Sequence, residues 1–128
     1  MGLFGGKKEL EPEIPPPLDG HGQKQGLTIM GVHAMPDALY PNLVKRYKGE
    51  PFLCTLTVRK TGQYKGAVDV YVKQAQLGSL PKEVAADWAA WIDARPRRAH
   101  APTALATATM DLGRPYGIVW IPRQPPTP

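Results

Sequence analysis

The chain has 128 residues, of which 42% are hydrophobic and 21% charged, a composition typical of one soluble globular domain. Residues 1–26 hold three lysines against four acids, whereas the remaining 102 residues hold 13 Lys and Arg against seven acids, so the net charge of +5 arises in the second part. A basic domain favours an anionic partner such as nucleic acid, and a single cysteine excludes an intrachain disulfide.

The sequence has no feature of a membrane or secreted protein. No apolar run reaches the length needed to cross a bilayer. The opening stretch MGLFGGKK lacks the apolar core of a secretory signal. We therefore expect a cytoplasmic protein with no membrane partner.

Both ends of the chain are predicted to be flexible. Residues 1–26 contain four prolines and few apolar side chains, too few to offset the entropy of ordering. Residues 123–128, RQPPTP, are expected to form a second loose end. The folded domain is therefore predicted to span residues 27–122.

The first half of this domain is predicted to be mostly β. Residues 27–33 have a strand composition interrupted by a glycine, and residues 41–48 are expected to form a short helix with Pro41 in its first turn. Residues 51–60 form the clearest strand because apolar residues alternate along it. Its expected inward face is Phe52, Cys54, Leu56 and Val58.

A hairpin is predicted next. Residues 67–73 alternate so that three valines face inward while Asp69 and Tyr71 face outward. The six-residue connection 61–66, with a glycine near each end, joins this strand to the preceding one. The stretch QAQLG then adds a third short strand.

A second helix is expected from Pro81 to just before Pro96, with Val84, Trp88 and Trp91 on one apolar face. Two further runs, 102–112 and 116–122, are predicted to form a closing hairpin joined by GRP. The order of elements predicts an α+β domain with a small curled or barrel-like sheet and two helices at its ends.

Catalytic patterns are absent from the sequence. Its three histidines are not paired with Cys or with one another at metal-ligand spacing, and no phosphate-binding loop or nucleophile elbow occurs. We therefore expect a protein that is not an enzyme and that has no metal and no cofactor.

Cations and aromatics are interleaved around the 61–66 connection, a pattern that suits single-stranded nucleic acid because cations pair with phosphates and rings stack on bases. The alternative is that they are ordinary solvated charges around a turn. The residues concerned are Arg59, Lys60, Tyr64, Lys65 and Lys73, together with Lys82 and the RPRR run at 95–98.

The stretch LGSLPKEVA (77–85) resembles the G-x-L-P-[KR]-E-x-A element of HIRAN domains. TGQYKGAVDVYV (61–72) occupies the place of that family's N-P-[YH]-D-x-N-A-[VI]-x-V motif, and the collinear resemblance covers about residues 27–94. It implies an OB-like β-barrel, which in eukaryotic HIRAN proteins binds the 3′ end of single-stranded DNA.

The resemblance assigns site residues position by position. Lys82 matches a basic residue of the family's pocket, and His33 and Tyr64 are partial counterparts of a basic and an aromatic position. Without gaps, the family's Asp falls on Tyr64 and its Asn on Gly66. A shift of one residue places Tyr64 on the family's aromatic position, and Lys65 then stands where the Asp belongs. The full predicted nucleic-acid site is His33, Arg59, Lys60, Tyr64, Lys65 and Lys82.

Two functions follow. The first is a non-enzymatic module that binds single-stranded or end-containing DNA on a basic, aromatic-containing face of an OB-like barrel. The alternative is a protein-interaction adaptor on the same fold, since the missing Asp and Asn indicate a degenerate DNA pocket. The bias toward Ala, Arg and Pro suggests a high-GC genome, actinobacterial or of a phage of such a host, and a phage protein could act on a host protein.

Overall fold

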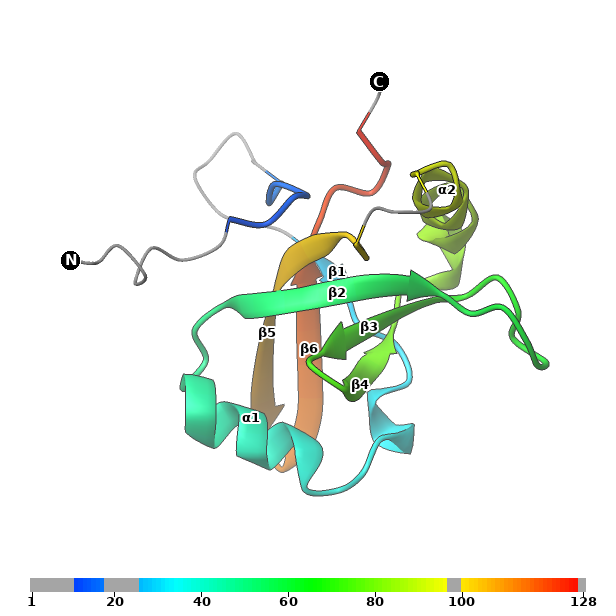
Figure 1. Ribbon diagram of the computed structural model, residues 1–128. Coiled ribbons are helices and arrows are strands. Elements are labelled where there is room, and N and C mark those ends of the chain that lie inside the picture. The colour runs from blue at the N-terminus through cyan, green and yellow to red at the C-terminus, as the bar shows by residue number, and fades with distance from the viewer. Residues whose placement is uncertain (1–10, 18–25, 97–99, 127–128) are drawn as a thin grey trace.

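The computed structural model describes residues 11–17, 26–96 and 100–126. It has the predicted α+β class, with an OB-like curled sheet and two helices (Figure 1). The elements are β1 (Leu27–Thr28), η2 (Val32–Ala34, a 3-10 helix), α1 (Leu39–Tyr47), β2 (Phe52–Val58), β3 (Val68–Val72), β4 (Ala75–Ser79), α2 (Lys82–Asp93), β5 (Thr103–Asp111) and β6 (Arg114–Trp120). In the ranges described, no helix has the length and apolar character to cross a membrane.

The sheet is antiparallel throughout and curls until its two edges meet. Its strand order is β1-β6-β5-β2-β3-β4. Met30, just after edge strand β1, exchanges two backbone hydrogen bonds of 2.8 and 2.9 Å with Ser79 at the end of edge strand β4. Gly78 permits this contact, because a Cβ there would lie 2.3 Å from the Met30 carbonyl oxygen. The predicted strand 27–33 therefore forms a strand only at residues 27–28, and Met30 connects the two edge strands of the sheet.

The two helices lie at opposite ends of the sheet, as predicted (Figure 1). Pro41 occupies the first turn of α1, where its missing N–H leaves no hydrogen bond unmade. Trp88 of α2 is fully buried and Trp91 is partly buried against it, edge to face. The predicted inward residues of β2 and β3 are buried, except that Val58 is only partly so.

The closing hairpin differs from the prediction at its turn. The connection is Leu112–Gly113 and not GRP, because Arg114 already pairs with Asp111. Both turn residues have positive φ, 52° and 79°, as a two-residue hairpin turn of the type I′ class requires. A glycine fits the second position, whereas the first places a leucine in a conformation that L-residues rarely adopt.

Part of the predicted leader packs against the domain. Ile14 is 0% exposed, and its backbone N–H donates a 3.0 Å hydrogen bond to the Thr103 carbonyl. Beside it, Glu13 accepts a 2.9 Å hydrogen bond from Arg95. The expectation of a loose segment is therefore wrong for these residues, since one apolar side chain in a polar stretch reaches the core. Residues 1–10 and 18–25 of that segment lie outside the described ranges.

Candidate nucleic-acid interface

The connection between β2 and β3 is a turn held by its own backbone. Arg59 and Gly66 are joined by a 2.8 Å hydrogen bond, and the Arg59 N–H donates to the Ala67 carbonyl at 2.8 Å. Ala67 in turn donates to the Tyr64 carbonyl at 3.0 Å. In Figure 1 this connection extends from the β2 and β3 ends, away from α1. Its four predicted site residues therefore share one ordered turn, and we call Arg59, Lys60, Tyr64 and Lys65 the loop surface.

Arg59 is partly exposed and is bound to a buried carboxylate. Its Nε and Nη2 donate hydrogen bonds of 3.0 and 2.6 Å to the two carboxylate oxygens of Asp69. The Ser79 hydroxyl donates a third bond, of 2.8 Å, to the same carboxylate. The hydrogen bonds between Arg59 and Asp69 raise the pKa of the Arg59 guanidinium. Through Asp69, Arg59 is linked to both β3 and Ser79 of β4, and two of its five N–H donors are engaged with the carboxylate instead of being free for a phosphate.

The outward prediction for Asp69 is wrong. The residue is only 5% exposed because the Arg59 fork and the Ser79 hydroxyl cover its carboxylate. The sequence held one signal of the Arg59–Asp69 pair. Asp69 stands between two valines of one predicted strand, and Arg59 lies in the neighbouring predicted strand. Alternation alone could not reveal that the arginine would fold back over it.

Lys60 and Lys65 differ in their partners. The Lys60 ammonium donates a 2.6 Å hydrogen bond to Asp93, at the last residue of α2, and both side chains are exposed. Lys65 is exposed and takes part in none of the ion pairs found among the described residues. Within the ranges that the structure describes, Lys65 is therefore the cation of the loop surface with no competing carboxylate.

Tyr64 is the exposed aromatic of the loop surface. Its residue is 63% exposed, and the Arg59 guanidinium carbon lies 5.9 Å from its ring centroid. An arginine already fixed by Asp69 thus lies over the ring at cation–π distance. The arrangement offers a supported ring to a planar ligand from solvent.

The remaining predicted site residues belong to other elements. Lys82 is exposed at the first residue of α2, whereas Lys60 contacts Asp93 at the last. The start of α2 lies beside the start of β3, because the Leu80 N–H donates a 2.9 Å hydrogen bond to the Val68 carbonyl. In the cluster at 95–98, Arg95 is bound to Glu13 and lies over Trp91 at 5.2 Å, and residues 97–99 lie outside the described ranges.

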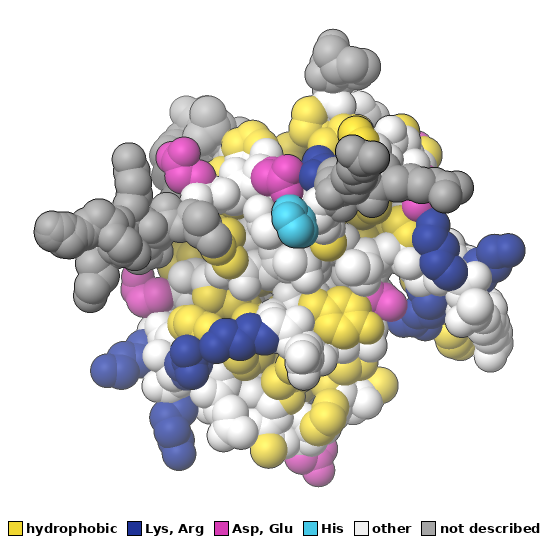
Figure 2. All heavy atoms as spheres, viewed as in Figure 1, with side chains coloured by type: hydrophobic (Ala, Val, Ile, Leu, Met, Phe, Trp, Pro, Cys, Tyr) yellow, Lys and Arg dark blue, Asp and Glu magenta, His cyan; other side chains and the backbone are white. Residues whose placement is uncertain are grey.

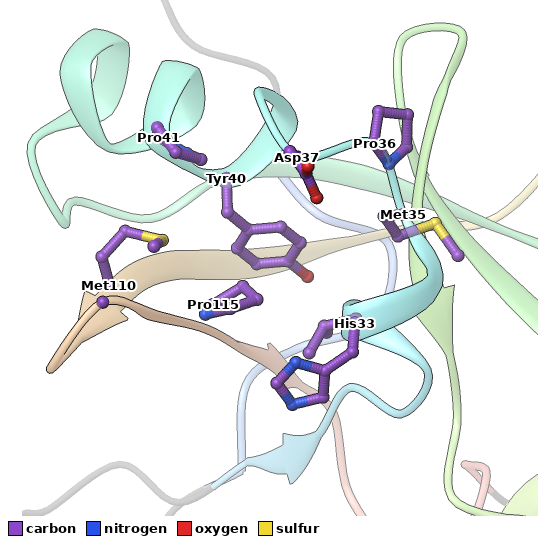
Figure 3. A pocket seen from close by; sticks show the side chains of 10 residues that line it. His33, Met35, Pro36, Asp37, Tyr40, Pro41, Met110 and Pro115 are labelled. Atoms are coloured by element: carbon purple, nitrogen blue, oxygen red, sulfur yellow. The ribbon is translucent and has the colours of Figure 1, made fainter.

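His33 lies at a different hollow, of about 220 Å³. This hollow is between η2, the start of α1 and the β5–β6 hairpin, and no residue of the loop surface lines it (Figure 3). The Tyr40 ring lies in the middle of its lining, and its hydroxyl donates a 2.9 Å hydrogen bond to the Leu77 carbonyl. Burial raises the pKa of Tyr40, so its hydroxyl stays a neutral donor. The prediction of a single site containing both His33 and Tyr64 is therefore not met by this geometry.

Reactive and metal-binding groups are not gathered in the described part of the chain. Cys54 is buried, and burial raises its pKa to about 12, so its sulfur is a neutral thiol near pH 7. The ranges that the structure describes hold no cluster of three His, Cys, Asp or Glu suited to a metal ion. The geometry supports contacts made by rings and cations.

A second cationic region escaped the sequence analysis. Lys45, Arg46 and Lys48 lie at the C-terminal end of α1, and Lys73, expected beside the loop surface, lies in the β3–β4 turn facing α1. Figure 2 shows Lys and Arg side chains gathered at two places, over α1 and at the β2–β3 connection. The run VKRYK at residues 44–48 was its signal in the sequence.

Comparison of the chain with protein-family models, with curated proteins and with solved structures gave no significant match.

Proposed function

We propose that this protein is a non-enzymatic module that binds single-stranded nucleic acid on its loop surface. The observation that carries the proposal is the exposed Tyr64 ring, supported by Arg59 and flanked by Lys65. An aromatic ring stabilises a stacked base by about 1–3 kcal/mol, and nearby lysines attract the phosphates. The OB-like curled sheet is a fold on which such surfaces recur.

The HIRAN resemblance supports a narrower form of this proposal, in which the ligand is a DNA end. Lys82 would then contribute from the start of α2 as the ligand passes beyond the loop surface. His33 lines the hollow beside α1, and no loop-surface residue lines that hollow. We therefore assign His33 no contact with the nucleotide that stacks on Tyr64. In this narrower form, end recognition by this chain depends on Tyr64 and Lys65 more than on His33.

The test is fluorescence anisotropy with a labelled oligothymidylate at low salt. We expect binding whose log Kd rises linearly with log salt concentration, with Tyr64→Ala weakening it about tenfold through the lost stacking. Tyr116→Ala is the matched control, because Tyr116 is also exposed but belongs to β6. Absence of binding at low salt, or equal loss in the two variants, would contradict the proposal.

Circular single-stranded DNA separates end binding from binding along the strand. If the module recognises an end, a linear oligonucleotide with a free 3′ hydroxyl binds more tightly than a circle of the same sequence. Equal affinity would reject end recognition and leave strand binding intact.

The second candidate function is a protein-interaction adaptor. It is favoured by the ion pairs of two loop-surface cations. Arg59 is paired with Asp69 and Lys60 with Asp93, so both are less available to phosphates. An adaptor retains its partner after nuclease treatment of a lysate, whereas a nucleic-acid module loses it. The phage origin suggested by composition stays a prediction.

A further inference from the structure

The β3–β4 turn lies beside α1, on the side of the molecule away from the loop surface (Figure 1). Side chains of α1, β3 and this turn line a groove. It has a volume of about 420 Å³. Its apolar part includes Leu39 and Leu43 of α1 and Val72 of β3, while Arg46 and Lys73 line it from opposite sides. We call this the α1 groove.

The cations of the α1 groove have no acidic partner among the described residues. The three ion pairs found there are Arg59–Asp69, Lys60–Asp93 and Arg95–Glu13. Lys45 and Lys48 add two more exposed cations on the same helix end. Figure 2 shows Lys and Arg side chains beside an apolar patch in this region. The groove is therefore positive and apolar at once.

Nucleic acid does not suit the groove, although the charge alone would allow it. Tyr47 is its aromatic residue, and Phe52 stacks on that ring at a centroid distance of 4.4 Å. The Arg46 guanidinium carbon lies over the same ring, 5.5 Å from its centroid. The ring of Tyr47 is therefore already engaged by two neighbours of its own chain, and an apolar floor offers nothing to a phosphate.

We propose that the α1 groove docks a short acidic peptide segment of a protein partner. An apolar side chain of the peptide occupies the floor formed by Leu39, Leu43 and Val72, and flanking carboxylates pair with Arg46 and Lys73. Charge complementarity selects this occupant, because burying the apolar floor brings the peptide's neighbouring charges to the two cations. The inference does not depend on nucleic-acid binding, and it gives the adaptor function a surface of its own.

A double variant removes the charges with little effect on the fold. Arg46 is exposed on α1, so Arg46→Gln keeps the helix. Lys73 has a φ of 55°, a conformation that glycine adopts freely, so Lys73→Gly keeps the turn. Lys65→Ala is the matched control because it removes an exposed cation from the loop surface. Thermal unfolding of each variant verifies that the domain remains folded.

The test is selection of random peptides displayed on phage against the full chain, followed by anisotropy with one enriched peptide. We expect the enriched peptides to carry Asp or Glu beside Leu, Ile or Phe. We also expect the double variant to bind the labelled peptide about tenfold more weakly, while Lys65→Ala binds it as the wild type does.

Four results would overturn the proposal. They are no enrichment, enrichment of peptides without acids, equal peptide affinity in the double variant, and an oligonucleotide affinity that falls more in the double variant than in Lys65→Ala. The last result would assign the groove to nucleic acid. Failure of the loop-surface proposal is separate, because it is read from Tyr64→Ala with oligonucleotide alone.

Discussion

The loop surface and the α1 groove are both basic, but the fold uses their cations differently. At the loop surface, Arg59 and Lys60 have carboxylate partners, and the supported ring of Tyr64 faces solvent. At the α1 groove, Arg46 has no carboxylate partner among the described residues, and the ring of Tyr47 is engaged by Phe52 and Arg46. A basic residue in a sequence therefore indicates an external anionic partner only where the structure shows that no acid of the same chain is paired with it.

The largest expected difference between the two regions is in stability. Arg59→Ala leaves the buried Asp69 carboxylate with only the Ser79 hydroxyl, and we expect it to lower the free energy of unfolding by about 2–3 kcal/mol. Arg46→Ala removes an exposed cation and should cost less than about 0.5 kcal/mol. Urea unfolding of both variants measures the difference.

The double variant Arg59→Ala with Asp69→Ala is the control for this comparison. Removing both partners leaves no unpaired buried charge, so the double variant should be more stable than Arg59→Ala alone. If Arg59→Ala and Arg46→Ala unfold at the same urea concentration, the stabilising role assigned to the Arg59–Asp69 ion pair is wrong.

A smaller difference is expected within the loop surface itself. Lys65→Ala should lower the slope of log Kd against log salt by about 0.7 for single-stranded DNA, because one phosphate contact is lost. Lys60→Ala should lower it less, since Asp93 competes for that ammonium. Asp93→Ala releases Lys60 and should strengthen binding a few-fold. Equal slopes for the two lysine variants would show that the ion pair does not restrain Lys60.

A pH-dependent effect is expected in β2, the strand that runs between the two regions. The folded pKa of Cys54 is about 12, above the ordinary value of 9.0, so its stabilising contribution is complete below pH 9 and is lost as the pH rises toward 12. We expect the unfolding free energy to fall by about 1 kcal/mol at about pH 10 from this thiol. Burial of Tyr40 acts in the same direction. Cys54→Ala should flatten the alkaline decline, and an unchanged decline would contradict this assignment.

The fold class was accessible from the sequence because periodicity reports burial directly. Alternation along β2 and β3 and the helical spacing of Val84, Trp88 and Trp91 predicted the elements. The edge closure between Met30 and Ser79 was not accessible, since an isolated pair of backbone hydrogen bonds has no side-chain pattern. Ile14 was missed for a related reason: one apolar residue among prolines has no period.

The candidate site was accessible only in part. The sequence brought Arg59, Lys60, Tyr64 and Lys65 together because they are neighbours along the chain. It could not place Lys73, which lies one strand length away from them at the α1 groove. Position along a hairpin determines which end of the sheet a residue reaches, and the sequence analysis assigned Lys73 to the wrong end.

The most direct measurement is a two-dimensional amide NMR titration of the full chain with oligothymidylate at low salt. The account predicts that the shift changes concentrate in residues 59–67, around the supported ring of Tyr64. They should leave α1 (39–47) and the turn at 73–74 unchanged. Shift changes concentrated in α1 and that turn, or no changes at all, would contradict the claim that the loop surface is the nucleic-acid interface.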